Sequence, residues 1–229
     1  MSFDARQRAR TDSRSPCPSY ASYARMLQVL ALFGLGLVLA GCSVIDKPVR
    51  ASVYDFGPGP MAAVAVAPAG LPALTLAEVD AGPALDSTAV LYRLVYANAQ
   101  QLLPYAQARW SMAPAQLLRQ RLRDRIGQQR TVLGPDDANP GSDPARWVLR
   151  VELEEFSQLF SAPAQSTGLV RLRATLVQSS ANGDRLVGQR MVVAQRPAPS
   201  PDAPGGVRAL GDATDAAVDE LVQWLSQQR

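Results

Sequence analysis

Cys42 is the residue whose type and surroundings most clearly predict chemistry in this sequence. It follows Leu39, Ala40 and Gly41, at the end of an apolar run that begins just after Arg25. A thiol is a nucleophile that can accept a lipid, and small residues before it let a peptidase bind the backbone closely. The alternative is an uncleaved N-terminal anchor in which the cysteine is incidental.

The length of the apolar run favours cleavage and lipidation at Cys42. Residues 26–41 carry no charge. About 14 apolar residues suit a signal peptide core and fall short of the ~20 that a membrane-spanning helix needs. The run ends in Leu-Ala-Gly-Cys, which resembles the bacterial lipobox. We therefore predict a lipoprotein signal peptide at residues 1–41, a lipidated cysteine and tether at 42–53, and a folded domain at 54–229.

The residue after Cys42 bears on the destination of the chain. Aspartate at this position retains some bacterial lipoproteins at the inner membrane, whereas the sequence has Ser43. Two or more acyl chains anchor a protein stably, while one binds only marginally. The expected location is the outer membrane, with a lipid anchor and the domain facing the periplasm.

Few other side chains could support catalysis. The chain has no histidine, its other cysteine is Cys17 in the leader, and its only lysine is Lys47 in the tether. Glu154 and Glu155 are the best carboxylate pair. Neighbours on a strand point to opposite faces, whereas a glycosidase needs two carboxylates that face one substrate at roughly 5–9.5 Å. We therefore predict that the protein is not an enzyme and takes no cofactor.

A polar loop at residues 134–145 contains oxygen ligands that could hold calcium. These ligands are Asp136, Asp137, Asn139 and Asp143. Their order does not match a calcium-hand loop, and the other residues of the segment are turn-formers. We interpret the segment as a loop and predict no metal site.

The charge distribution argues against nucleic-acid binding. The basic excess of the chain comes from the five arginines and two aspartates of residues 1–41, and the remainder is neutral. A nucleic-acid-binding domain needs a basic face that neutralises phosphates. The predicted mature domain has no such surplus, so nucleic acid is not an expected partner.

The periodicity of the domain predicts an α+β fold. Apolar spacing predicts helices at residues 114–128, with a stripe of Ala115, Leu118, Leu122 and Ile126, and at 212–227, with Asp212 as N-cap. Strands are predicted at residues 54–58, 62–67, 90–96, 147–156, 169–178 and 185–195, with an Asn182-Gly183 hairpin turn. Residues 68–88 fit no clear element, and 197–206 reads as a Pro/Gly loop. The order predicts a largely antiparallel sheet with both helices packed on one face.

The sequence also predicts a bulge, a set of charge pairs between two strands, and an arginine-rich surface on the first helix. The alternation slips at Glu154-Glu155, which indicates a bulge. Glu152 and Glu154 are expected to share the outer face with Arg171 and Arg173 of the next strand. The arginines of the first helix either bind an acidic partner or lie on a solvated face; they are Arg119, Arg121, Arg123 and Arg125.

The aromatic residues allow two interpretations. They could line a contact surface for a partner or a lipid, or they could belong to the core, which is usual for aromatic residues in strands. The residues concerned are Tyr54, Tyr92, Tyr105 and Trp110. Phe156, Leu159 and Phe160 could likewise form an apolar lip or pack beneath the following loop.

Several short motifs, in order, resemble one family. They are the lipobox, Tyr54-Asp55-Phe56-Gly57-Pro58, Leu91-Tyr92-Arg93, Tyr105 with Arg109-Trp110, Pro114-x-x-Leu117-Leu118, and Leu149-x-Val151-Glu152-Leu153-x-x-Phe156 before the hairpin. Over roughly residues 42–228 the sequence resembles the ABC-type transport auxiliary lipoprotein family, of the PqiC type.

The resemblance implies a function by binding. Members of the family are non-catalytic accessory components in the periplasm, beside ABC transporters and MCE-domain proteins that move lipids between the two membranes. The implied partners are an MCE-domain protein, ABC transporter components and, in a ring, further copies of the chain as a homo-oligomer. The competing hypothesis is a structural or assembly lipoprotein of an outer-membrane complex.

Overall fold

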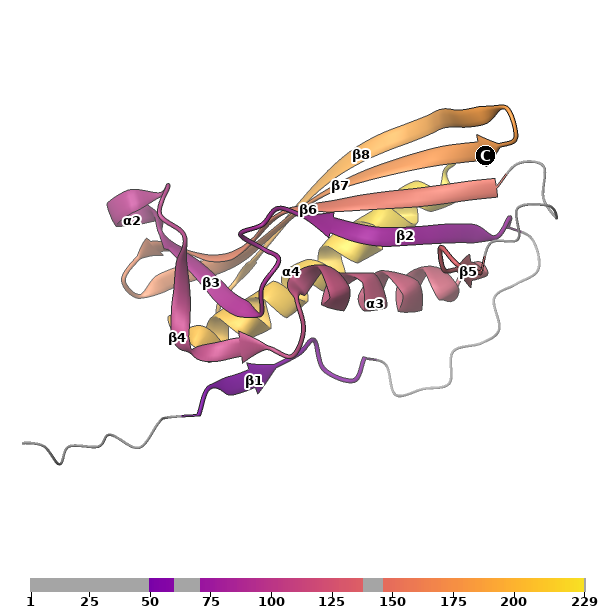
Figure 1. The fold of residues 1–229 in the computed structure, drawn as a ribbon. Helices are drawn as coiled ribbons and strands as arrows, with labels where there is room; N and C mark the ends of the chain where they lie inside the picture. The colour runs from indigo at the N-terminus through magenta and orange to yellow at the C-terminus, as the bar shows by residue number, and fades with distance from the viewer. Residues whose placement is uncertain (1–49, 60–70, 138–145, 229) are drawn as a thin grey trace, which may run out of the picture. The chain divides into compact units, whose positions relative to one another are not determined.

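The computed structural model describes residues 50–59, 71–137 and 146–228, and Arg50–Arg229 form one compact unit. The predicted leader, Cys42 and the predicted strand at 62–67 lie outside the described residues. In chain order the elements are β1 (Ser52–Tyr54), β2 (Leu74–Ala81), β3 (Ala89–Leu94), α2 (Val95–Asn98), β4 (Leu103–Trp110), α3 (Pro114–Gly127), β5 (Val132–Leu133), β6 (Arg146–Ala162), β7 (Gln165–Ser180), β8 (Gly183–Pro197) and α4 (Ala203–Ser226) (Figure 1).

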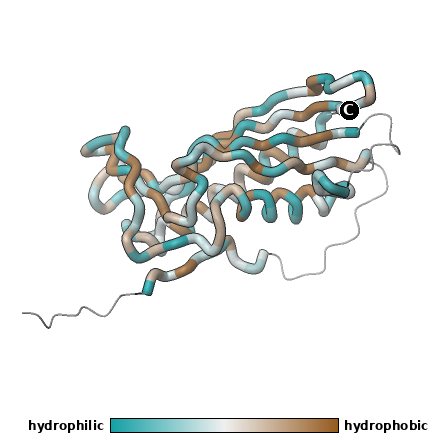
Figure 2. Tube along the Cα trace, viewed as in Figure 1, coloured by the Kyte–Doolittle hydropathy of each residue, from teal (hydrophilic) through white to brown (hydrophobic). Residues whose placement is uncertain are grey.

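Strands β6, β7 and β8 form a long antiparallel meander. Hydrophobic and hydrophilic residues alternate along them, so that one face is buried (Figure 2). At the turn between β7 and β8, Gly183 has a φ of 112°, which glycine adopts without the strain that a Cβ would bring. The three predicted strands and the hairpin are confirmed, and each strand is longer than predicted. The two turn residues are Ala181 and Asn182 rather than the predicted Asn182 and Gly183, because Gly183 already pairs with Ser180.

The other edge of β6 has two parallel partners placed end to end. β2 pairs with β6 from Trp147 to Leu153, and β3 pairs with it from Gln158 to Phe160. Residues 154–157 of β6 therefore have no strand beside them on this edge, within the part of the chain that the structure describes. β4 and then β1 extend the sheet beyond β3, and β5 lies beyond β2.

Helices α3 and α4 pack on the same face of the sheet (Figure 1). α4 covers β6, β7 and β8, while α3 lies on β2 and contacts α4. The predicted stripe of α3 is buried, and α4 buries residues that include Val218, Leu221 and Leu225. The α+β class, with a largely antiparallel sheet and both long helices on one face, is confirmed.

Helix α4 begins nine positions earlier than the sequence predicts, so Asp212 is not its N-cap. The N-cap is Asp202, whose carboxylate accepts a hydrogen bond from Gly205 N at 2.8 Å. The glycines of the first turns favour the prediction of a loop, but here they allow close packing. A Cβ on Gly206 would collide with the side chain of Gln158.

Three further strands, β2, β4 and β5, and one short helix are absent from the prediction. β2 lies in the Ala/Pro/Gly-rich stretch that fits no clear element, and β4 covers residues predicted only as aromatic motifs. The strand predicted at 90–96 ends at Leu94, where the four-residue helix α2 begins. β2 and β4 each lie between two partner strands, and their formation depends on these neighbours more than on their own periodicity.

Candidate functional site

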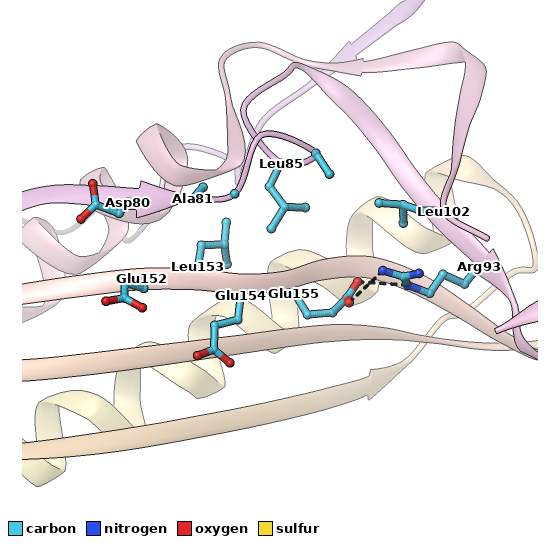
Figure 3. Close-up of a pocket in the computed structure, with 11 residues that line it drawn as sticks. Asp80, Ala81, Leu85, Arg93, Leu102, Glu152, Leu153, Glu154 and Glu155 are labelled. Atoms are coloured by element: carbon cyan, nitrogen blue, oxygen red, sulfur yellow. Dashed lines mark hydrogen bonds and ion pairs between the residues drawn. The ribbon is translucent and has the colours of Figure 1, made fainter. Parts of the chain in front are cut away.

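A cavity of about 520 Å³ lies at the break between β2 and β3 (Figure 3). We call it the break cavity. Its lining combines leucine side chains with four carboxylates and one guanidinium; the residues are Asp80, Ala81, Gly82, Ala84, Leu85, Arg93, Leu102, Glu152, Leu153, Glu154 and Glu155. The cavity exists because β6 changes partners here and the loop after β2 turns away from it.

The predicted bulge in β6 shapes this cavity. The register with β7 shifts between Leu153 and Glu155, which confirms the bulge. The extra residue interrupts the alternation of side chains, so Glu154 and Glu155 both line the cavity. The prediction that these two carboxylates point to opposite faces is therefore wrong at this position.

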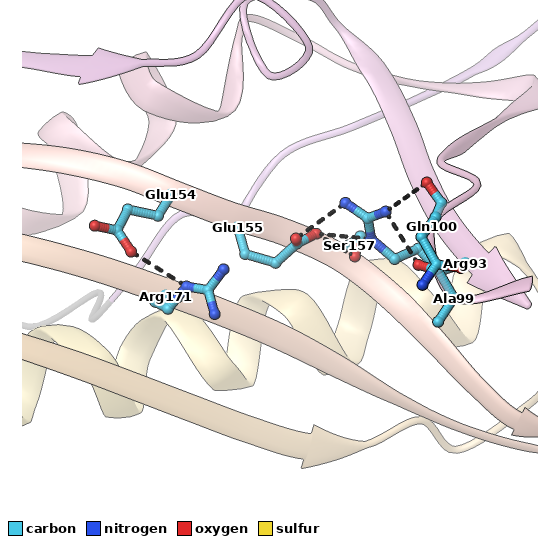
Figure 4. A network of polar contacts seen from close by, with 7 residues as sticks. All are labelled: Arg93, Ala99, Gln100, Glu154, Glu155, Ser157 and Arg171. Atoms are coloured by element: carbon cyan, nitrogen blue, oxygen red, sulfur yellow. Dashed lines mark hydrogen bonds and ion pairs between the residues drawn. The ribbon is translucent and has the colours of Figure 1, made fainter. Parts of the chain in front are cut away.

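Both glutamates are held by arginines (Figure 4). Glu155 accepts hydrogen bonds from Arg93, Nε to Oε1 at 3.3 Å and Nη2 to Oε2 at 3.1 Å, and a third from Ser157 Oγ at 2.7 Å. Glu154 pairs with Arg173 at 2.7 Å and with Arg171 at 3.2 Å. The charges of Glu154 and Glu155 are thus compensated within the chain.

The pairing of Glu152 and Glu154 with β7 confirms the predicted outer face of the sheet. Glu152 lies 3.8 Å from Arg173, and Glu154 contacts both arginines. Opposite charges across neighbouring strands contribute roughly 0.2–1 kcal/mol each. These contacts support the register between β6 and β7 on either side of the bulge.

Arg93 has a second role that the sequence does not reveal. Its Nη1 also donates to the carbonyl oxygens of Ala99 and Gln100, each at 3.4 Å (Figure 4). The side chain therefore links Glu155 on β6 to the residues that follow α2. The motif Leu91-Tyr92-Arg93 was the only available signal, and it carries no information about these distant partners.

The aromatic residues named in the sequence analysis fall into two groups, one buried in the core and one half-buried. Trp110 is 2% exposed and packs edge-on against Phe56 and Phe156, so it belongs to the core. Tyr92 and Tyr105 are half-buried, with ring centroids 4.6 Å apart. Of the predicted apolar lip, Phe156 and Phe160 are buried.

Tyr105 is bound into the end of the sheet. Its hydroxyl donates to Gln158 Oε1 at 2.8 Å, and Gln158 Nε2 donates to Ser166 Oγ at 2.8 Å. Burial of the ring raises the pKa of Tyr105 to about 12, and the neighbouring Tyr92 and Asp202 act in the same direction. The phenol therefore stays protonated and serves as a hydrogen-bond donor.

Three of the α3 arginines form ion pairs with carboxylates of this chain. The sequence predicts either an acidic partner or a solvated face, and these ion pairs are neither. Arg119 pairs with Glu78 of β2 at 3.0 Å. Arg121 pairs with Asp215 at 3.2 Å and Arg125 with Asp219 at 3.0 Å, both on α4. These contacts fix α3 between β2 and α4.

The remaining predicted sites are described only in part or not at all. Leu39, Ala40, Gly41 and Cys42 lie outside the described residues, as do Asn139 and Asp143. Asp137 is occupied by a hydrogen bond from Gly134 N at 2.9 Å. Over the described ranges, no group of three or more His, Cys, Asp or Glu side chains is arranged to hold a metal ion. In these same ranges no helix is both long and apolar enough to cross a membrane.

The fold and the site define a small α+β domain with an ion-paired cavity at a break in its sheet. The chain matches the family of ABC-type transport auxiliary lipoprotein components over residues 54–222, and it belongs to this family. It is therefore an auxiliary lipoprotein component of transport systems. Among curated proteins, none matches it.

Solved structures show the same fold at low sequence identity. The crystal structure of protein XCC0632 from Xanthomonas campestris is 21% identical, with a TM-score of 0.60, over 76% of this chain and 94% of that one. A crystal structure described as an uncharacterized protein is 14% identical, with a TM-score of 0.52, over 77% and 99% of the two chains. At these identities the likeness concerns the fold alone.

Proposed function

We propose that this protein is a lipid-anchored periplasmic accessory component of an ABC/MCE-type envelope lipid transport system. The family match over residues 54–222 carries the proposal. It begins shortly after Leu39-Ala40-Gly41-Cys42, the order of residues that the lipid attachment needs. In this proposal residues 1–41 are removed and Cys42 carries the lipid. The tether predicted at 42–53 is shortened by β1, so the domain predicted at 54–229 begins near Ser52.

The domain acts by binding rather than by catalysis. Glu154 and Glu155, the best catalytic pair in the sequence, are each engaged by arginine in the break cavity. A general acid or base needs a titratable group free to exchange its proton with a substrate. The described residues include no histidine, cysteine or lysine that could take this role in their place.

The proposed location is the outer membrane, because Ser43 rather than aspartate follows Cys42. An anchor of this kind confines the domain to a thin layer of the periplasm, which raises its effective concentration for a partner that spans the space. The proposed partners are an MCE-domain protein and the transporter components, with several copies of this chain forming a ring.

Isolation of the protein from native membranes tests this proposal. Tagged wild type and the variant Cys42→Ala are expressed at equal levels, membranes are solubilised gently, and co-purifying proteins are identified by mass spectrometry. We expect an MCE-domain protein or a transporter subunit with the wild type, and much less of it with the variant. If none co-purifies with the wild type, and deletion leaves envelope permeability to detergents unchanged, the proposal is wrong and an assembly role replaces it.

A further inference from the structure

One end of the domain is formed by two stretches without a charged residue. Residues 94–108 run from the end of β3 through α2 into β4, and residues 156–170 run from β6 through its turn into β7. They meet because Leu94 lies beside Phe160. We call this region the α2 end, and it lies on the left in Figure 1. The opposite end of the sheet carries Arg146, Arg150, Asp184 and Arg185.

The α2 end exposes apolar side chains. Val95 is 42% exposed and Tyr96 is 49% exposed, and α2 has no buried residue. The helix therefore adds nothing to the core. It is nevertheless held in place, because Arg93 donates to the carbonyls just after it.

The first described residues of the domain, Arg50 and Ala51, lie toward the α2 end from β1. β1 pairs in parallel with β4, so residues before Ser52 run toward Leu103, where β4 begins. Leu103 lies beside Tyr92, which lies beside Gln158 near the end of β6. Residues 42–50 span at most about 28 Å, because an extended chain reaches roughly 3.3–3.6 Å per residue.

The length of the sheet exceeds the maximum span of the tether. An upright domain, with the sheet perpendicular to the bilayer, therefore cannot stand on its far end while Cys42 is anchored. Leu186, beside the β7–β8 turn, pairs with Val177, which pairs with Val148. Val148 lies about 33 Å from Gln158 along β6, at roughly 3.3 Å per residue. In an upright domain, a lipid on Cys42 therefore keeps the α2 end nearer to the bilayer than Leu186.

We propose that the α2 end is a membrane-contact surface, with Val95 and Tyr96 at the level of the lipid headgroups. This inference rests on the proposed lipid anchor at Cys42. Tyrosine is enriched at membrane interfaces, where its ring is apolar and its hydroxyl remains hydrated. Charged residues near this end include Arg93 and Glu155, which pair with each other, and Arg50, Arg196, Arg208 and Asp202. The basic excess of this set suits anionic headgroups.

With this contact, the anchor also fixes the orientation of the domain on the membrane. A lipid alone leaves the domain free to rotate about its tether, whereas a second contact fixes which end faces away from the membrane. The break cavity and the charged far end of the sheet are then presented to the periplasm. A protein partner at the α2 end is the competing occupant, and the experiment separates the two.

Site-specific labelling of the full-length protein tests the contact. If Cys17 leaves with the leader and Cys42 carries lipid, the mature chain has no free thiol, and wild type serves as the labelling control. Single cysteines are introduced as Tyr96→Cys, Ala164→Cys and Leu186→Cys, all at exposed positions. Each labelled protein is reconstituted into phosphatidylethanolamine–phosphatidylglycerol vesicles, with a quencher on the lipid headgroup.

We expect the fluorophores at positions 96 and 164 to lose most of their emission, while the one at position 186 keeps it. Val95→Asp with Tyr96→Asp should restore emission at position 164. Equal quenching at all three positions in protein that floats with the vesicles overturns the inference. Shielding at position 96 that needs a protein partner and not the vesicles also overturns it. Protein that fails to float overturns the anchor, and this inference with it.

Discussion

Arg93 and Glu155 lie 62 positions apart in the sequence, and their side chains meet through two hydrogen bonds beside the break cavity. The pair joins β3 to β6 where β6 has no other strand on that edge. Because Arg93 also binds the carbonyls after α2, one side chain connects the cavity to the α2 end.

Loss of the Arg93 side chain should lower the stability of the domain. In Arg93→Met, Glu155 keeps a largely buried charge without its partner, and the free energy of unfolding should fall by about 1–3 kcal/mol. Urea denaturation measures the change. Adding Glu155→Gln should recover part of the loss. Arg150→Met breaks an exposed pair with Asp184 and should cost only about 0–1 kcal/mol. Equal losses in the two single variants would contradict the assigned role of Arg93.

Gly168 should tolerate no side chain. A Cβ there would lie 2.6 Å from the backbone of Ala209 and Leu210, so Gly168→Ala must push α4 away from β7. Such overpacking costs about 1–3 kcal/mol. The matched control is Gly211→Ala, where a Cβ meets nothing within 4 Å, and this helical position should gain roughly 0.5–1 kcal/mol. Thermal unfolding of both variants tests the close packing of α4 on the sheet.

Substitution of two aspartates tests the position at which α4 begins. Asp202→Ala removes the cap and should cost about 1 kcal/mol, whereas Asp212→Ala, in an exposed position within the helix, should be nearly neutral. Denaturant midpoints of the two variants measure this difference. A larger loss for Asp212→Ala would place the start of the helix where the periodicity alone predicts it.

The stability of the domain should decline at high pH through Tyr105. Its pKa is raised to about 12 in the folded protein, above the ordinary value of 10.0, so folding favours the protonated phenol. The stabilisation from this shift is complete below pH 10 and is lost as the pH rises toward 12. Tyr105→Phe should therefore show a smaller decline in unfolding free energy over this interval. If its pH profile parallels that of the wild type, the phenol does not titrate as the structure indicates.

Mass spectrometry of the membrane form should identify Cys42 as the first residue of the mature protein, carrying lipid. The apolar run before it is too short to span a bilayer, which needs ~20 residues. Cys42→Ser should abolish lipidation and leave residues 1–41 attached. A wild-type membrane form that retains these residues would contradict both the cleavage and the anchor.

The long, regular elements were predictable because their signals are local. Alternation over β6, β7 and β8 and the stripe on α3 depend only on neighbouring residues and one apolar face. The bulge at Glu154 was visible as a slip in that alternation. The sequence does not show that both Glu154 and Glu155 line the break cavity, because this depends on the strand partners of β6.

The break cavity itself could not be derived from the sequence. It needs β2 and β3 to share one edge of β6, and β2 lies in a stretch without clear periodicity. Arg93 and Glu155 are far apart in the chain, so only the folded topology brings them together. The early start of α4 is not predictable for a related reason. Gly205 and Gly206 are typical of a loop, and only the folded structure shows their close packing against Ser200 and Gln158.

The attachment of β1 determines how the domain would respond to mechanical force. β1 is three residues long, pairs only with β4 among the described strands, and follows directly on the tether. A pull along the axis of this strand would load the three paired positions together in shear rather than open them one at a time. The hydrogen bond from Ser111 N to Tyr54 O, at 2.7 Å, shares that load. In a chain anchored through Cys42, tension on the tether would thus enter the sheet through the pairing of β1 with β4.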